Sequence, residues 1–420
     1  MSFFAKSSNR NGFLATQLIF LGISLASGIP SYLTIFLAAK NLESANFANF
    51  IGFWTILNAC GLIFFSPIEH FAARAQDSGQ KEKSNFDSVI SRWTTWALVL
   101  SFSISVLFGT TLFNQPPNQV AWMSLLFLIP LASWTYKKAL NFKSNQPRRT
   151  LNSALAILTL SLAILWGISL IEPGSPELYL LALPTAWGLV SMGRLLYFVK
   201  AARANHRVEV FPELKAYISY SIHTATYAVL ASAGIVLLSS SSSAVLELSS
   251  YVAIITLTRA GFQIVNTLTP AIALHYATNA LSVTNVRNMS ALHSLVSIFA
   301  GAIAFLAFVL FGNWLVAFYI HSSLTLSTLT LLLLVLGESL WAAMSGISTA
   351  LISRGGERIF IYSSLAAVSV FTLTIYLFGI NATGVGLASS VSGFSVIAVQ
   401  YFWFWRIAKD DSSKDIKRAL

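Results

Sequence analysis

The sequence predicts an all-α polytopic membrane protein of about twelve transmembrane helices in two six-helix lobes, with both termini in the cytoplasm. The chain is 55% hydrophobic and only 10% charged. Its apolar residues form runs of about 20, the length that a helix needs to cross about 30 Å of hydrocarbon. Lys and Arg favour cytoplasmic loops, and here every second connection between apolar runs is basic.

The predicted spans follow one another closely along the chain. They cover residues 13–38, 47–68, 93–113, 119–136, 150–171, 178–199, 217–238, 251–272, 290–312, 324–348, 359–378 and 384–405. With the N-terminus inside, all but three of the 26 Lys and Arg residues fall in inner connections or tails. The exceptions are Lys40, in an outer connection, and Arg194 and Arg259, within spans. Shifting this frame by one span would place nearly all these cations outside.

The spans divide as six and six around a long basic connection. The predicted parts are a lobe of residues 1–199, a cytoplasmic connection 200–216, a second lobe 217–405 and a cytoplasmic tail 406–420. Pro67, near the inner end of span 2, has a counterpart in Pro270 of span 8. Two halves of the same orientation suggest a repeat about the membrane normal, as in transporters that rock one half against the other.

Composition argues against several other classes of protein. The net charge of +11 is scattered over short inner loops and therefore does not suggest a nucleic-acid partner. The single Cys60 lies inside a span, which excludes a disulfide framework. No phosphate-binding loop occurs, the outer connections are short, and their carboxylates are not paired for acid–base chemistry. The histidines lack metal-ligand spacing, so we expect no enzyme, metal or cofactor.

Polar residues recur at helical spacing on spans 1 and 7, the first helix of each predicted lobe. Gln17 and Ser24 share a stripe on span 1, ahead of Pro30, which removes a backbone donor and weakens the helix. Tyr220 and Thr224 belong to a similar face of span 7. These stripes suggest residues that line a hydrated cavity and contact substrate. The alternative is ordinary packing, because small and hydroxylated residues are common between membrane helices.

Two charges lie at bilayer depth, where each costs at least about 2.5–3.5 kcal/mol. Arg259 is about 12 Å into span 8, and Glu338 is about 21 Å into span 10. Arg259 is a candidate to bind an anionic diphosphate or a sugar acid, or it pairs with a carboxylate. Glu338 is a proton or sodium site, or the partner of a buried arginine. The sequence alone leaves these alternatives open.

Three further titratable side chains lie nearer the ends of spans. Arg194 can extend its long side chain to the inner headgroups. Glu69, at the inner mouth of span 2, belongs to a solvated cluster or to a gate. His223, one to two turns into span 7, can titrate near neutral pH or serve as a hydrogen-bonded packing residue. All three are candidates for ion coupling or ion pairing.

Two stretches of the chain resemble a known family. Residues 36–50 read FLAAKNLESANFANF, similar to the junction between the first two helices of the oligosaccharide-lipid flippases of the O-antigen type. Residues 350–358 read ALISRGGER and residues 379–389 read GINATGVGLAS, which resemble the approach to that family's last two helices. Lys40 stands where the family usually has Arg, and span 7 lacks the family's usual Gly-x-Pro.

The resemblance implies a member of the multidrug, oligosaccharidyl-lipid and polysaccharide exporter superfamily. The implied work is translocation of an undecaprenyl-diphosphate-linked oligosaccharide across a bacterial cytoplasmic membrane by alternating access, with Lys40 among the substrate-binding candidates. Expected partners are this substrate, membrane lipids, a coupling proton or sodium ion, and a polymerase and glycosyltransferases of the same pathway. The alternatives are a cation-coupled multidrug exporter and a membrane scaffold without transport of its own.

Overall fold

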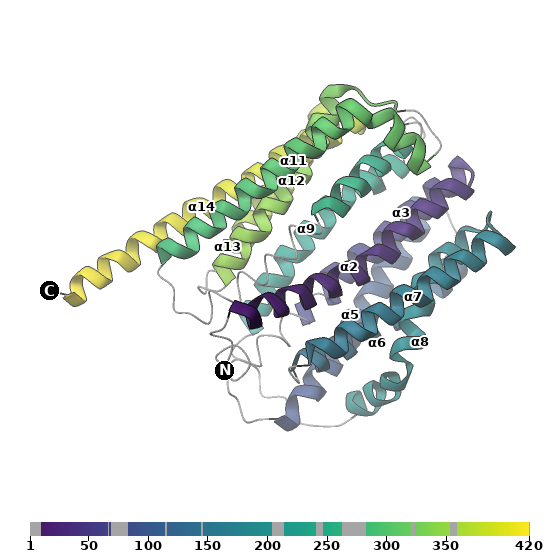
Figure 1. The fold of residues 1–420 in the computed structure, drawn as a ribbon, viewed down its shortest axis with the longest axis horizontal. Helices are drawn as coiled ribbons and strands as arrows, with labels where there is room; N and C mark the ends of the chain where they lie inside the picture. Colours follow the sequence, from purple (N-terminus) through teal and green to yellow (C-terminus); the bar gives the residue numbers. More distant parts are fainter. Residues whose placement is uncertain are drawn as a thin grey trace. The chain divides into compact units, whose positions relative to one another are not determined.

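Helices make up nearly all of the computed structural model in the part of the chain that it describes (Figure 1). It describes residues 10–65, 67–68, 83–113, 116–143, 146–203, 214–240, 247–262, 283–320, 324–352 and 359–419. The helices are α2 (Arg10–Asn41), α3 (Ser44–Cys60) with the π-helix η1 (Gly61–Phe65), α5 (Lys83–Phe113), α6 (Pro117–Lys143), α7 (Pro147–Ile171), α8 (Pro176–Arg203), α9 (Leu214–Ser240), α11 (Val283–Ile320), α12 (Thr328–Ile352), α13 (Ile359–Phe378) and α14 (Ala382–Ala419). Residues 247–262 are also helical. The all-α prediction is confirmed.

Most of these helices can cross a membrane. Among the described residues, nine are long and apolar enough to do so by length and composition. Two more predicted spans, 178–199 and 217–238, fall on α8 and α9. The predicted span 251–272 begins in the helix of residues 247–262 and continues outside the described part of the chain. The chain is therefore a multi-pass membrane protein, as predicted.

Local sequence sets several helix boundaries. Pro117, Pro147 and Pro176 each occupy the first position of a helix, where the missing N–H is not needed. Gly379 follows α13 with a φ of +80°, a conformation that glycine adopts without a steric penalty. Asn381 then accepts a hydrogen bond from the Gly384 N–H through Oδ1 at 2.8 Å, which caps α14.

The first two spans differ in detail from the prediction. Helix α2 passes through Pro30 without a break, and the Pro30 carbonyl accepts a 2.8 Å hydrogen bond from Thr34 Oγ1. The predicted weakening therefore does not interrupt the helix. Helix α3 instead widens into the π-helix Gly61–Phe65 close to Pro67. Periodicity does not predict this irregular turn, because the apolar pattern continues through it.

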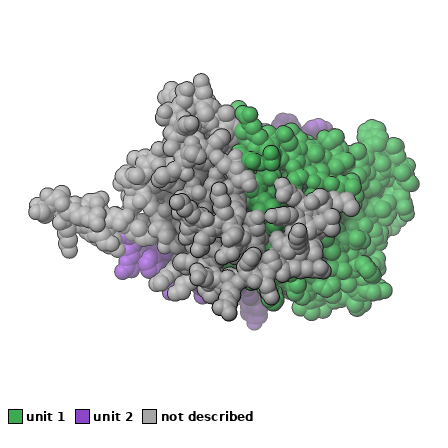
Figure 2. Space-filling view, turned by 90° about the horizontal axis from the view of Figure 1, so that it is seen from below, with its two compact units in different colours: residues 1–217, 235–249, 319–321 green, residues 218–234, 250–318, 322–420 purple. Residues whose placement is uncertain are grey.

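The chain forms two compact units (Figure 2). The first comprises residues 1–217, 235–249 and 319–321, and the second comprises residues 218–234, 250–318 and 322–420. In the first unit, α6 packs against α5 and α8, and α2 packs against α7. In the second unit, α14 packs against α12 and α13. The lobe boundaries predicted from sequence, 1–199 and 217–405, remain predictions.

Aromatic residues dominate the core of the first unit. The Phe127 ring meets the edges or faces of both Trp54 and Trp187, at centroid distances of 5.6 and 5.5 Å and nearly perpendicular to each. Such edge-to-face pairs add to the stabilisation from burial alone. In the second unit, Ile347 and Leu351 of α12 form a buried apolar cluster with Ile359 and Phe360 of α13. Each unit thus has an interior of its own.

Candidate functional site

The second unit contains a buried ion pair between Arg259 and Glu338. Arg259 Nε donates to Glu338 Oε2 at 2.9 Å, and Nη2 donates to Oε1 at 2.7 Å. Nη2 also donates to the Ala231 carbonyl at 2.6 Å. This bidentate geometry matches the planar guanidinium to the carboxylate, the strongest form of such a pair. The pair joins α9, the helix of residues 247–262 and α12, which are distant in sequence.

The two partners differ in exposure. The side chain of Glu338 is 6% exposed, whereas that of Arg259 is 25% exposed. Glu338 is therefore enclosed, and most of the exposed surface of the pair belongs to the Arg259 side chain. A guanidinium has five N–H groups, and the Nη1 nitrogen makes no hydrogen bond to the residues that the structure describes. Its two N–H groups can serve an additional acceptor while the bond to Glu338 persists.

Aromatic side chains surround the pair. Tyr227 of α9 and Tyr251 lie close enough to interact electrostatically with both charges. The Tyr227 ring contacts Trp341 of α12 at a centroid distance of 5.5 Å. A Cβ at Gly234 would overlap the Tyr251 hydroxyl, so glycine is needed at this point of α9. The surroundings are thus largely apolar, which strengthens the attraction between the two charges.

The geometry places together two residues that the sequence had singled out separately. Arg259 and Glu338 form the ion pair that was one alternative for each of them. Diphosphate binding by Arg259 and ion coupling by Glu338 remain predictions. Thr224 is buried on α9, about two turns before Ala231. Tyr220 and His223 also belong to α9, but their side chains lie outside the described part of the structure.

The remaining candidates belong to the first unit. Lys40 is exposed at the end of α2, with Nζ 5.4 Å from the centre of the Phe36 ring. Ser24 is half-buried on the same helix. Gln17 and Arg194 lie in α2 and α8, but the structure does not describe their side chains, and Glu69 lies wholly outside the described residues. Nothing in the structure assigns substrate contact to these residues.

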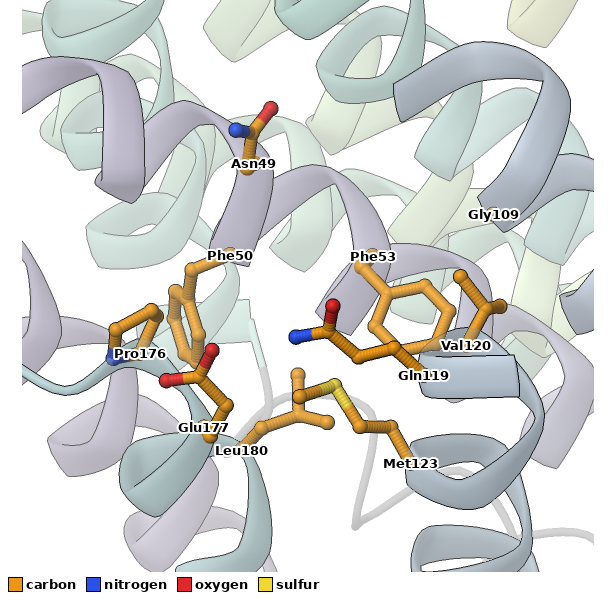
Figure 3. Close-up of a pocket in the computed structure, with 10 residues that line it drawn as sticks. All are labelled: Asn49, Phe50, Phe53, Gly109, Gln119, Val120, Met123, Pro176, Glu177 and Leu180. Carbon is orange, nitrogen blue, oxygen red and sulfur yellow. The ribbon is translucent and has the colours of Figure 1, made fainter. Parts of the chain in front are cut away.

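The first unit also contains a pocket that the sequence did not reveal (Figure 3). It has a volume of about 80 Å³ and lies where α3, α5, α6 and α8 meet. Its lining consists of Asn49, Phe50, Phe53, Gly109, Gln119, Val120, Met123, Pro176, Glu177 and Leu180. Glu177 is one of the carboxylates near the predicted outer connections, which the sequence did not pair for acid–base chemistry. The sequence feature that could have indicated this pocket is a polar residue in the first turn of α6, Gln119, and another in the first turn of α8, Glu177.

Metal ligands do not gather in the part of either unit that the structure describes. The described residues include no group of three or more His, Cys, Asp or Glu that could hold a metal ion. The chemistry that the structure presents is therefore that of an ion pair, hydroxyls and amides in apolar surroundings. Such sites bind and orient ligands through a few well-placed polar groups.

Solved transporter structures resemble the whole chain. No family model matches the chain, and no curated protein matches its sequence. The eukaryotic MATE transporter AtDTX14 matches over 96% of this chain and 98% of its own, with 14% identity and a TM-score of 0.63. The Vibrio cholerae MATE transporter VcmN in its bent form matches over 94% and 97%, with 11% identity and a TM-score of 0.55.

The lipid II flippase MurJ, in an inward closed conformation, also matches over most of the length. The match covers 92% of this chain and 87% of MurJ, with 13% identity and a TM-score of 0.51. Identities this low establish similarity of fold only. This chain is therefore a polytopic membrane protein with the fold found in MATE transporters and in the lipid II flippase MurJ.

Proposed function

We propose that this protein translocates a lipid-linked oligosaccharide across a bacterial cytoplasmic membrane by alternating access between its two lobes. The observation that carries the proposal is the Arg259 side chain, which is 25% exposed and keeps Nη1 without a hydrogen bond to the described residues. An undecaprenyl diphosphate presents anionic oxygens, and arginine, which remains charged, can donate to them from the two N–H groups of Nη1. The similarity to a lipid II flippase over most of the chain supports this substrate class.

A purely structural role explains the ion pair less well. Well-packed apolar residues of similar volume often stabilise a protein as much as a buried ion pair does, or more. A chain that keeps both charges in a membrane therefore has a use for them. The incomplete burial of Arg259, against the nearly complete burial of Glu338, indicates that the useful partner is the cation.

Glu338 supplies a reason for ion coupling in this proposal. A diphosphate that approaches the Nη1 side meets a cation already neutralised by Glu338. Full engagement of the anion weakens the bond to Glu338, and the carboxylate then needs a proton or a sodium ion in its apolar surroundings. Substrate binding and cation binding are linked through competition for Arg259.

A cation-coupled multidrug exporter is the second candidate function. The observation that favours it is the enclosed carboxylate of Glu338, which could hold the coupling cation, in a fold matched by two MATE transporters. A scaffold without transport is a third reading, in which the protein assembles a polymerase and glycosyltransferases among the membrane lipids. The two transport functions differ in the charge of their substrate.

Leaflet-resolved detection of lipid-linked sugar tests the proposal. Cells without the protein should retain this lipid in the inner leaflet, and the wild-type protein should restore it to the outer leaflet. Arg259→Ala should abolish this delivery, and Arg259→Lys should impair it partially, because one ammonium group cannot serve Glu338 and the substrate in the planar arrangement of Nε, Nη2 and Nη1. Arg149→Ala, which removes an exposed cation at the start of α7, should translocate normally.

Two results would refute the flippase proposal. One is normal delivery of lipid-linked sugar in cells without the protein. The other is an Arg259→Ala protein that is present at the normal level and translocates at the normal rate. If the same cells instead accumulate a cationic dye, and the wild-type protein expels it, the exporter function is correct.

A further inference from the structure

The pocket in the first unit is lined by an amide, a carboxylate and apolar side chains. Figure 3 shows the Gln119 amide and the Glu177 carboxylate near the rings of Phe50 and Phe53, with Met123 beside them. Phe50 and Phe53 are buried, Glu177 is half-buried and Gln119 is exposed. The polar groups therefore lie toward the open side of a pocket whose rings are fixed by packing.

The polar groups select the chemical class of the ligand. The Glu177 carboxylate only accepts hydrogen bonds, and Oε2 already accepts one from Ser175 Oγ at 3.1 Å, so Oε1 remains available. The Gln119 amide both donates and accepts. An anion would be repelled by Glu177, and no Lys or Arg lines the pocket to hold one. Hydroxyl groups, which donate and accept at once, satisfy both side chains.

The apolar part of the pocket fits one edge of a sugar ring. A volume of about 80 Å³ has room for several hydroxyl-sized groups, since about 10–15 Å³ of such volume is enough for one water molecule. The remainder of a saccharide would extend past Gln119 into solvent. The C–H groups of the ring can rest against Phe50 and Phe53, since pockets for small ligands are mostly apolar with a few oriented polar groups.

The position of the pocket along the chain agrees with a sugar ligand. Asn49, Gln119 and Glu177 lie at or near the starts of α3, α6 and α8, which are the outer ends of predicted spans 2, 4 and 6. Positively charged residues are sparse on this predicted outer side. An oligosaccharide delivered to the outer leaflet would have its sugars at this level.

We infer that this pocket is a saccharide subsite on the outer side of the first unit. It holds hydroxyls of one sugar residue of the translocated lipid, between the Glu177 carboxylate and the Gln119 amide. The inference rests on the proposed function for the source of the sugar. The pocket chemistry itself comes only from the residues that line it.

Saturation-transfer NMR on the full chain in phospholipid nanodiscs tests the inference. The probes are the methyl glycosides of glucose, galactose and N-acetylglucosamine, each added alone. At least one should receive saturation from the wild-type protein. Glu177→Leu and Gln119→Leu should each weaken its binding about tenfold or more, because each leaves a hydroxyl without its partner. Glu172→Leu removes an exposed carboxylate five positions away and should bind as the wild type does.

Each other outcome overturns the inference. Absence of saturation for all three glycosides would do so, as would equal saturation in the two pocket variants. Binding of ethanolamine in place of the glycosides, lost in Glu177→Leu, would instead identify an amine site for a lipid headgroup. If Glu177→Leu fails to fold, Gln119→Leu decides, since its exposed side chain supports no packing.

The test separates this inference from the proposed function. Glycoside binding that depends on Gln119 and Glu177, in a protein that delivers no lipid-linked sugar, would support the pocket and refute the flippase. Normal delivery without any glycoside binding would support the flippase and refute the pocket.

Discussion

In the second unit, helix α11 is more apolar than helix α12 but is less buried. Within Ser290–Tyr319 of α11, an 18-residue stretch has a mean hydropathy of 2.5, yet only 22% of its residues are buried. Within Thr328–Ser348 of α12, the corresponding 18-residue stretch has a mean hydropathy of 1.6, and 78% of its residues are buried. In a membrane the more apolar helix faces lipid, whereas the less apolar helix holds the polar groups away from lipid. The lower hydropathy and the greater burial of α12 are therefore both consistent with the ionised side chain of Glu338 that it carries.

The seam between the two helices is polar and close. His293 Nε2 of α11 lies 3.2 Å from the Ala342 carbonyl and 3.3 Å from Ser345 Oγ of α12. Ser294 Oγ donates to the Ala343 carbonyl at 3.4 Å. A Cβ at Gly346 would overlap the His293 ring, so the glycine allows this approach. The two helices thus contact each other directly although they differ in burial. Substitutions on one helix or the other can therefore show how much each contributes to stability.

The largest expected effect comes from breaking the ion pair of α12. Arg259→Ala should lower the free energy of unfolding by about 3–5 kcal/mol, because it leaves the enclosed Glu338 charge without a partner. Chemical unfolding in detergent measures this, with exposed Glu172→Ala as the control. The double variant Arg259→Glu with Glu338→Arg should regain part of the loss. Arg259→Ala that unfolds like the wild type would show that the pair contributes no stability.

The next effect tests the approach of α11 to α12. Gly346→Ala should destabilise the protein by about 1–3 kcal/mol, because the added methyl group meets the His293 ring. Gly167→Ala on α7 is the matched control, since nothing lies within 4 Å of its added Cβ. That control should be stabilised by roughly 0.5–1 kcal/mol through helix propensity. Equal midpoints of thermal unfolding for the two variants would contradict the close seam.

Substitution of two tryptophans, one on each helix, should change the free energy of unfolding by a smaller amount. Trp341 of α12 is 1% exposed and donates from Nε1 to Ser389 Oγ at 3.2 Å, whereas Trp314 of α11 is 65% exposed. Trp341→Phe should cost about 1–2 kcal/mol, from lost packing and an unpaired hydroxyl. Trp314→Phe should stay within about 0.5 kcal/mol. The comparison of the two helices fails if both changes have the same effect on unfolding.

Cysteine substitutions for labelling should have the smallest effect on stability. They test whether lipid or water covers the residues at the surface. In a Cys60→Ser background, Leu306→Cys on α11 should leave unfolding unchanged, since that side chain is exposed, whereas Asn381→Cys beside α14 should cost about 1 kcal/mol because it removes the cap on Gly384. A membrane-impermeant thiol reagent on intact cells should label Asn381→Cys only, because lipid covers position 306. Asn145→Cys should react only after permeabilisation. Labelling of Asn145→Cys in intact cells would invert the predicted orientation.

Sequence reasoning predicted the helices well because spanning requires length and apolar character, and both are local properties. Eleven of the twelve predicted spans overlap named helices, and the twelfth begins in residues 247–262. The same reasoning selected Arg259 and Glu338 by the cost of a charge at depth. It could not pair them, since contact between helices 79 positions apart depends on their rotation and packing.

The pocket of the first unit was not predictable for a related reason. Gln119 and Glu177 are ordinary residues for the first turn of a helix, and neither carries an unusual signal alone. Their significance arises only when α6 and α8 pack side by side against the aromatic residues of α3. The π-helix after Cys60 escaped prediction as well, because it changes backbone geometry without changing the apolar pattern.

The pairing of Arg259 with Glu338 has a consequence for how the membrane potential acts on this protein. A single elementary charge moved across the membrane changes in energy by about 2.3 kcal/mol per 100 mV. A closed pair carries no net charge, so moving it as one body through the electric field costs almost nothing. A pair that opens, with one partner neutralised by a bound ligand or ion, regains a net charge and responds to voltage. Opening of the 2.7 Å contact between Nη2 and Oε1 would therefore increase the response of this region to the potential.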